Sequence, residues 1–378
     1  MSPTIAEPHG RVAGGFERVA EELRATVHGP GAAFAATVDG EVVVDVWSGT
    51  ADDAGTPWQE DTVVPVFSGT KGLVAVCLLL LVERGQLELD VPVARYWPEF
   101  AAAGKERLLV RHVVSHEAGL PGVLPPVSAA EILDGRRQED RLADTVPFWE
   151  PGTRLAYHAL TFGWLCAALV RRVDGRSIGR FFADEVAGPL GLDLWIGLPP
   201  ELEPRVATLQ RGDDFGITFL GDEPEPLLAA LYGDLLDTFV WNEPPYHEAE
   251  IPAANAIGTA RSIARLYGCL ACDGELGGRR LLSPETVRLG RRELARGPCA
   301  VTSRPYAFGV GFELQTELLT LGPPPDAFGH TGSGGSRHGA WPGPRVGFSY
   351  AMSELRSEES DDRGRRILAA LEKAVARR

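Results

Sequence analysis

The amino-acid sequence predicts an α+β protein in which helices and strands are mixed. Its expected core is an antiparallel sheet flanked by terminal helices, with an all-helical lobe inserted between the two parts of the sheet. Three observations predict this class: strand patterns near both ends of the 378-residue chain, an amphipathic helix pattern at each end, and helical periodicity through most of the middle. The strands near the two ends are therefore expected to share one sheet.

The first elements follow from the spacing of apolar residues. Residues 14–28, GGFERVAEELRATVH, place apolar side chains at three-to-four spacing, as an amphipathic helix does. Two strand patterns follow, AAFAATV at 32–38 and EVVVDVW at 41–47. Asp39-Gly40 between them is the strongest short-range signal for a β-hairpin. The sequence therefore predicts a helix and then a hairpin.

Helical patterns occupy the middle of the chain, and strand patterns return near its end. The remaining helices are expected at 68–85, 161–173, 178–192, 253–272 and 362–375, and the remaining strands within 306–314, 329–339 and 346–354. The expected division is 12–65 with 275–378 for the sheet and its terminal helices, and 66–274 for the mainly helical lobe. Residues 199–252, rich in Pro, Asp and Glu, are expected to form an irregular insertion in that lobe.

Charge and terminal sequence argue against several classes of partner. The chain has 37 basic and 52 acidic residues, a net charge of -15, and no basic stripe that could follow a phosphate backbone, so nucleic acid is not an expected partner. The N-terminus, MSPTIAEPHGRVAGGF, lacks the pattern of a secretory signal, and the longest apolar run is too short to span a membrane. A cytoplasmic protein without a membrane partner is expected. The oligomeric state stays open.

The stretch VFSGTKGLVAVCLLLLV, residues 66–82, places a serine and a lysine at the start of a helix that is apolar on every face. Ser68 and Lys71 are three residues apart, so they lie on the same helical face. The helix N-terminus and burial both disfavour an ammonium ion, and a lysine with a lowered pKa can accept a serine proton. The alternative is that Ser68 caps the helix and Lys71 extends to solvent.

The motif SGTK on a buried helix resembles the nucleophile motif of serine beta-lactamases, penicillin-binding proteins and the family VIII carboxylesterases. Three further segments are similar to segments of these proteins: GEVVVDVWSG at 40–49, VVSHEAGLP at 113–121 and GGRRLLSPETV at 277–287. The resemblance covers residues 12–375 in the expected order. It implies the beta-lactamase/transpeptidase-like fold, with Ser68 as nucleophile and Lys71 as its base.

Two further motifs of the resembling enzymes have counterparts here. Tyr157, in AYHAL, stands where a tyrosine takes the proton of the nucleophile and returns it to the leaving group. His330, Thr331 and Gly332 stand where the family has Lys-Thr-Gly on a strand beside the cleft. The resemblance implies that the backbone N–H groups of Ser68 and Ser333 form the oxyanion hole.

The chain departs from beta-lactamases at two of these motifs. His330 replaces a lysine that helps to hold a substrate carboxylate, and Ala159 replaces an asparagine that contacts the amide of a beta-lactam. Both changes are typical of the esterase branch, and they favour neutral esters over anionic amides. We therefore expect a carboxylesterase for small, short-chain esters, with weak or no beta-lactamase activity.

Other residues and functions offer alternatives to this interpretation. Trp341 is a candidate for lining an acyl pocket, with core packing as the alternative. Neither the Cys269/Cys272 pair nor the His112/His116 pair has the further ligands of a zinc site, so no metal and no cofactor is expected. The alternatives to an esterase are an acyltransferase of the same fold, a D-amino-acid-specific peptidase or amidase, and a non-catalytic binding protein.

Overall fold

The computed structural model describes residues 9–212, 214–215, 231, 238–357 and 360–378. Within these residues, nine strands form one antiparallel sheet in the order β1-β3-β2-β15-β14-β13-β12-β11-β10. The predicted α+β class is confirmed. The strands are β1 His9–Val12, β2 Ala32–Val38, β3 Glu41–Ser48, β10 Ala295–Pro298, β11 Pro305–Phe308, β12 Glu313–Leu314, β13 Phe328–Gly332, β14 Ser336–Trp341 and β15 Val346–Met352.

The two ends of the chain meet in the middle of this sheet. Strand β15 pairs along its whole length with β2, with Val346 opposite Val38 and Met352 opposite Ala32. The β2–β3 hairpin is also confirmed. Asp39 and Gly40 both have positive φ values, 51° and 81°, as expected for the two-residue turn that matches strand twist.

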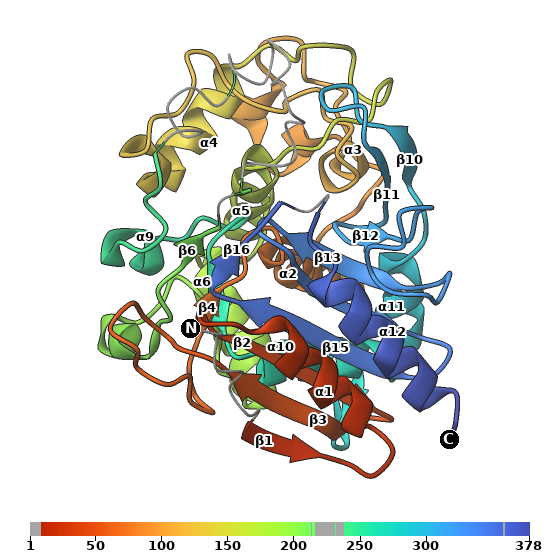
Figure 1. Cartoon of the computed structure of the whole chain (residues 1–378). Coiled ribbons are helices and arrows are strands. Elements are labelled where there is room, and N and C mark those ends of the chain that lie inside the picture. Colours follow the sequence, from red (N-terminus) through yellow and green to blue (C-terminus); the bar gives the residue numbers. More distant parts are fainter. Residues whose placement is uncertain (1–8, 213, 216–230, 232–237, 358–359) are drawn as a thin grey trace.

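Helices cover both faces of the sheet. The terminal helices α1 (Glu17–Thr26) and α12 (Arg363–Val375) pack against each other across one face (Figure 1). Helix α10 (Ala260–Ala271) packs on β15, β2 and β14. Its Gly268 lies against Gly347 of β15, where a Cβ atom on Gly347 would overlap the helix backbone. Helix α10, which lies in the segment expected to form the helical lobe, thus packs on the sheet, because this pair of glycines lets helix and strand backbones approach closely.

Helix α2 (Thr70–Glu83) is the centre of the helical part of the molecule, and its residues from Thr70 to Leu81 are buried. It packs against α5 (Thr161–Asp174), α6 (Ile178–Phe182) and α11 (Pro284–Gly290) and also contacts β13 of the sheet. A helix that is apolar on every face must be packed against other elements on every side, because each face has to be removed from water. Its contact with β13 brings the two parts of the molecule together at the start of α2.

Two helix expectations need correction. The segment expected as one helix at 178–192 comprises α6, a π-helical turn η4 (Ala183–Ala187) and α7 (Gly188–Leu190), which ends at Gly191 in the left-handed conformation. The helix expected at 253–272 begins only at Ala260. Ahead of it lies β7 (Ala256–Gly258), the central strand of a small sheet with β4 (Val64–Pro65) and β5 (Leu194–Ile196).

The expected insertion at 199–252 is described only in part, and much of it lies outside the described residues. Its described elements are short. They are η5 Pro200–Arg205, β6 Gln210–Arg211 and α9 Pro244–Glu248, and β6 pairs with β16 (Glu354–Leu355). The remaining elements are η1 Val93–Arg95, η2 Pro98–Ala101, α3 Val110–Val114, η3 Glu131–Leu133, α4 Gly135–Asp144, β8 Glu275–Leu276 and β9 Arg279–Arg280. In the part of the chain that is described, no helix is both long enough and apolar enough to cross a membrane.

Candidate active site

Ser68 lies in a tight turn just before α2. The preceding residue, Phe67, has a φ of +46°, a conformation that bulky residues rarely adopt, and such strain often accompanies a functional site. The turn is tied to the first residue of β7, because Val66 N donates to Ala256 O at 2.9 Å and Thr70 Oγ1 accepts from Ala256 N at 2.8 Å. These bonds fix the backbone on both sides of Ser68.

The side chain of Ser68 does not cap the helix. The cap position is Gly69, where a Cβ atom would meet the ring of His338 at 2.5 Å, so only glycine fits there without movement of the ring. The Ser68 hydroxyl instead contacts Lys71, whose Nζ lies 3.1 Å from Ser68 Oγ. The helix therefore begins at Thr70, two residues after the expected start at Ser68. The Ser68 hydroxyl makes no capping hydrogen bond and can take part in a reaction.

Lys71 is completely buried, with 0% of its surface exposed. Its Nζ lies 2.8 Å from Ala159 O and 2.9 Å from Ala253 O, in addition to its contact with Ser68. The alternative in which this side chain extends to solvent is therefore wrong. Burial lowers the pKa of Lys71 well below its usual value, because water no longer stabilises the ammonium form.

The three contacts of Lys71 match the needs of a neutral amine. A neutral amine has two N–H donors and one lone pair. If the two N–H groups donate to Ala159 O and Ala253 O, the lone pair is directed to Ser68 Oγ and accepts the hydroxyl proton. The arrangement can thus take a proton from Ser68, which is what a general base requires.

Tyr157 lies above the amine, on the loop that leads into α5. Lys71 Nζ is 4.8 Å from the centroid of its ring. The ring stacks on Tyr306 of β11, with centroids 5.2 Å apart and planes 13° from parallel, and Tyr157 N donates to Cys299 Sγ at 3.3 Å. Strand β11 and the β10–β11 turn therefore hold the tyrosine in place over the lysine.

One small pocket brings most of the predicted site residues together. The strand motif reaches it through His330 and Thr331 of β13, and Ser333 follows in the turn to β14. Gly332 lies behind the pocket against Val66, where a Cβ atom would collide with Val66 O. The described lining residues are Ser68, Tyr157, Arg304, Tyr306, His330, Thr331 and Ser333.

Lys71, Gly332 and Trp341 are the predicted site residues outside the described lining of this pocket. Lys71 contacts the lining residue Ser68 and Gly332 lies next to Thr331 and Ser333, whereas Trp341 lies in the core. It is fully buried at the end of β14, with its ring centroid 5.3 Å from that of Phe348, and its indole N–H donates to Leu321 O at 2.8 Å. Its surroundings are those of the core around α1 and α12. Trp341 therefore packs in the core, as the alternative from the sequence had it. The expected contact of Trp341 with substrate is corrected.

Glu313 supports the strand motif, a role that the sequence did not reveal. This carboxylate is 3% exposed. It accepts hydrogen bonds from both the backbone N–H and the hydroxyl of Thr331, at 3.0 and 2.9 Å, and from Thr320 Oγ1 at 3.1 Å. Because β12 and β13 are antiparallel neighbours, only their register places Glu313 beside Thr331. No sequence signal marks this glutamate.

Two buried histidines form the wall behind Tyr157. His116 stacks between Phe162 and Phe308, and its Nδ1 accepts from His158 N at 3.0 Å. His158 Nε2 accepts from Leu120 N at 3.0 Å. Burial lowers the pKa of His116 well below its usual value and that of His158 to about 4. Both rings are therefore neutral near neutral pH, and they add no positive charge next to Lys71.

His112 and His116 have the i,i+4 spacing of a possible ligand pair in the sequence. His112 instead turns back to the start of α3, where its Nδ1 accepts from Leu109 N at 3.3 Å. Among the described residues, no cluster of three or more His, Cys, Asp or Glu side chains is arranged to hold a metal ion.

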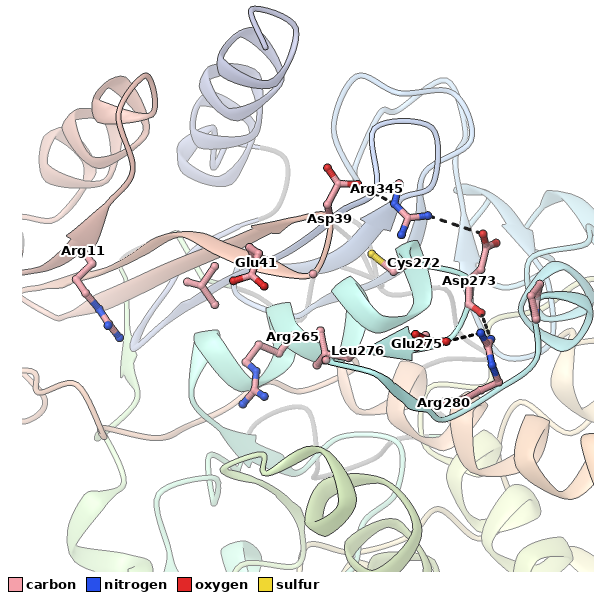
Figure 2. A pocket seen from close by; sticks show the side chains of 14 residues that line it. Arg11, Asp39, Glu41, Arg265, Cys272, Asp273, Glu275, Leu276, Arg280 and Arg345 are labelled. Atoms are coloured by element: carbon pink, nitrogen blue, oxygen red, sulfur yellow. Dashed lines mark hydrogen bonds and ion pairs between the residues drawn. The ribbon is translucent and has the colours of Figure 1, made fainter.

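A larger depression elsewhere on the molecule contains no comparable chemistry. It lies between the β2–β3 hairpin and the end of α10, and shares no residue with the pocket around Ser68. Figure 2 shows that two of its arginines, Arg280 and Arg345, are directed to neighbouring acidic residues. Arg345 Nε lies 2.8 Å from Asp39 Oδ1, and Arg280 pairs with Glu275. We assign this depression no catalytic role.

Comparisons with known proteins show which family the chain belongs to. The Beta-lactamase family model matches residues 16–372. Over 340 residues the chain is 39% identical to the esterase/beta-lactamase LipL of Mycobacterium tuberculosis, covering 86% of this chain and 77% of that protein. The crystal structure of a family VIII carboxylesterase superposes with a TM-score of 0.89 at 35% identity, covering 97% of this chain and 100% of that chain. A penicillin-binding protein homologue from Caulobacter crescentus gives the same TM-score and identity, over 97% of this chain and 99% of that one.

Proposed function

This chain belongs to the beta-lactamase family, and on that premise we propose that it is a carboxylesterase that cleaves small, short-chain esters through an acyl-enzyme on Ser68. One observation carries the proposal: a fully buried lysine amine lies 3.1 Å from Ser68 Oγ, and its two other hydrogen-bond partners are backbone carbonyls, so that the neutral amine can direct its lone pair to the hydroxyl. The esterase-named relative and the carboxylesterase structure support the reaction class.

In the proposed reaction, Ser68 Oγ attacks the ester carbonyl as its proton passes to Lys71. The negative charge that develops on the carbonyl oxygen is stabilised by the backbone N–H groups of Ser68 and Ser333, which both border the pocket. Tyr157, within reach of the amine, delivers the proton to the leaving alcohol. Water then enters, gives up a proton by the same route and releases the carboxylic acid.

The preference for esters over beta-lactams is part of the proposal. Ala159 contributes its carbonyl oxygen to Lys71, and its methyl group has no donor for a beta-lactam amide. His330 sits where beta-lactamases have a permanently charged lysine. We therefore propose weak or no beta-lactamase activity. An acyltransferase would use the same acyl-enzyme and differ in its acceptor.

The test is covalent labelling of the nucleophile. The full-length protein is incubated with a serine-directed fluorophosphonate and the modified peptide is mapped by mass spectrometry. We expect one adduct, on Ser68, none in Ser68→Ala, and an unchanged adduct in the control Ser303→Ala, whose side chain is exposed. Adducts on another serine contradict the proposal.

Product analysis then separates the alternatives. With a 4-nitrophenyl ester of a short acid and an added alcohol, an esterase releases mainly free acid, whereas an acyltransferase forms mainly the new ester. A D-amino-acid amidase would instead cleave D-phenylalanine amide faster than the ester. A protein that is neither labelled nor active on any of these compounds would be a non-catalytic binding protein.

A further inference from the structure

A short turn between β13 and β14 carries Ser333, whose backbone N–H is proposed for the oxyanion hole. Gly332 pairs with Ser336 across the two strands, so only three residues connect them. Gly334 and Gly335 in this turn both have positive φ values, 85° and 112°, a region of the backbone that favours glycine. The direction of the Ser333 N–H therefore depends on how this turn is held.

Residues that follow β15 in the chain pack directly on the turn. A Cβ atom on Gly334 would lie 2.4 Å from Leu355 Cδ2, and one on Gly335 would lie 2.2 Å from Asp361 Oδ2. Arg356 N also donates to Gly334 O at 3.1 Å. The turn is thus in contact both with β16 and with the residues just before α12.

Arg363, the first residue of α12, connects these contacts. It is 5% exposed. Its Nε and Nη2 donate to the two carboxylate oxygens of Asp361 at 2.8 and 2.9 Å. Its Nη1 donates to Glu354 Oε2 at 2.9 Å, and its Nη2 lies 3.0 Å from Glu354 O and 3.5 Å from Gly334 O. Because a guanidinium is planar and its donors are fixed, one side chain sets the positions of all three partners.

We propose that Asp361 and Arg363 are positioning residues, which hold the β13–β14 turn so that the Ser333 N–H is directed at the oxyanion. The inference rests on the proposed esterase function. Glu313 already holds Thr331, two residues before Ser333, so the pair completes the support on the other side. Oxyanion donors act only at about 2.7–3.1 Å from the charged oxygen, and a misplacement of about 1 Å can cost about a hundredfold in rate.

The test uses two esters that differ only in the atom that the oxyanion hole binds. kcat and KM are measured from phenol release for phenyl acetate and for O-phenyl thioacetate, in which sulfur replaces the carbonyl oxygen. Sulfur accepts hydrogen bonds weakly, so a well-placed N–H group favours the oxygen ester. The ratio of the two kcat/KM values therefore reports the oxyanion hole, and the same ratio for hydroxide in water is the value without one.

The variants are Arg363→Lys, Asp361→Asn and the double variant Asp361→Asn/Arg363→Gln. Lysine keeps the charge of arginine but not its planar set of donors. The double variant removes both members of the buried pair together, which avoids leaving either charge alone. The control is Arg261→Lys, since Arg261 pairs with Asp45 of β3 at 2.7 Å and the side chain of Asp45 is 7% exposed.

We expect the wild-type ratio to exceed that of hydroxide by about a hundredfold, since loss of one oxyanion donor costs about that much or more. In Arg363→Lys and in the double variant, kcat for phenyl acetate and the ratio should both fall by about tenfold, with little change in KM. Asp361→Asn should have a smaller effect, because Arg363 keeps its bonds to Glu354. Arg261→Lys should keep the wild-type ratio. A merely structural role would slow both esters alike and leave the ratio unchanged.

Three results overturn the inference. One is a wild-type ratio equal to that of hydroxide, which needs no variant. Another is a ratio that the variants leave unchanged, or that Arg261→Lys lowers equally. The third is failure of all three variants to fold, which would limit the pair to stability. In each case, labelling of Ser68 and cleavage of phenyl acetate by the wild type leave the esterase proposal intact. If Ser68 is not labelled and no ester is cleaved, the esterase proposal itself fails.

Discussion

The side-chain nitrogen of Lys71 lies 3.1 Å from the hydroxyl oxygen of Ser68, and its other polar contacts are backbone carbonyls of Ala159 and Ala253, from two distant parts of the chain. No carboxylate of a described residue lies within ion-pair distance of this amine. An ammonium ion here would be buried without a carboxylate of a described residue at ion-pair distance. The fold therefore favours the neutral form, which is the form that can accept a proton.

Removal of the amine should abolish the proposed activity. Lys71→Met keeps the length and apolar character of the side chain but removes the base, so kcat is expected to fall by about a hundredfold or more. Steady-state ester hydrolysis measures this, with circular dichroism as the check on folding. The control is Lys373→Met, an exposed lysine near the end of α12, which should retain full activity. Near-normal turnover in Lys71→Met would remove Lys71 from the mechanism.

The pH dependence should report the lowered pKa of Lys71. A base with a lowered pKa is neutral above that value, so kcat/KM should rise with pH at a point well below the pKa of an ordinary lysine, about 10.4, and fall as acid protonates the amine. The measurement is a pH–rate profile for an uncharged ester. A profile that rises only near the ordinary lysine pKa would show that the amine is charged in the folded protein.

Tyr157→Phe should slow turnover without disturbing the site. The ring stack on Tyr306 is kept, while the hydroxyl that delivers the proton is lost, so kcat should drop by about a hundredfold. The matched control is Tyr350→Phe, which removes a buried hydroxyl on β15 that has no hydrogen-bond partner among the described residues. Equal rates for the two variants would exclude Tyr157 as the proton carrier.

Gly72 and Tyr267 should show strong energetic coupling. A Cβ atom at Gly72 would collide with the Tyr267 hydroxyl, so Gly72→Ala should lower the free energy of unfolding by about 1–3 kcal/mol, although alanine favours a helix. That hydroxyl is buried and has no partner among the described residues. Tyr267→Phe should therefore be neutral or stabilising, and should rescue Gly72→Ala in the double variant. Urea denaturation of all four proteins measures the coupling, and simple additivity would refute the predicted clash.

Acid should destabilise the protein through its buried histidines. The pKa of His158 is about 4 in the folded protein and near 6.5 when unfolded, so the unfolded chain binds more protons between these values. Stability is complete above pH 6.5 and falls as the pH drops towards 4, by about 3 kcal/mol for this residue. His158→Gln, which does not titrate, should lose less stability over this range. Equal losses in urea denaturation at each pH would contradict the assignment.

Local patterns determined much of the fold. The alternation around Asp39-Gly40 predicted the hairpin, and three-to-four spacing predicted the terminal helices, because these signals depend on neighbours within a few residues. The same spacing did not predict the interruption of the helix expected at 178–192. Its π-helical turn at Ala183–Ala187 has the same apolar spacing as an ordinary helix, so periodicity could not separate the two. The position of α10 was missed because it depends on Gly268 meeting Gly347, a contact across 79 residues that no local pattern encodes.

The sequence by itself determined the proposed nucleophile motif, since Ser68 and Lys71 are separated by a single turn at the start of α2. Only the tertiary structure decided what the lysine faces, which is a pair of carbonyls instead of solvent, and which side chains join the pocket. Glu313, Arg304 and Tyr306 come to the site from the sheet edge, and Trp341 stays in the core. The reason is physical: charge state and reactivity depend on burial and on neighbours brought from far along the chain, and these exist only once the layers have packed.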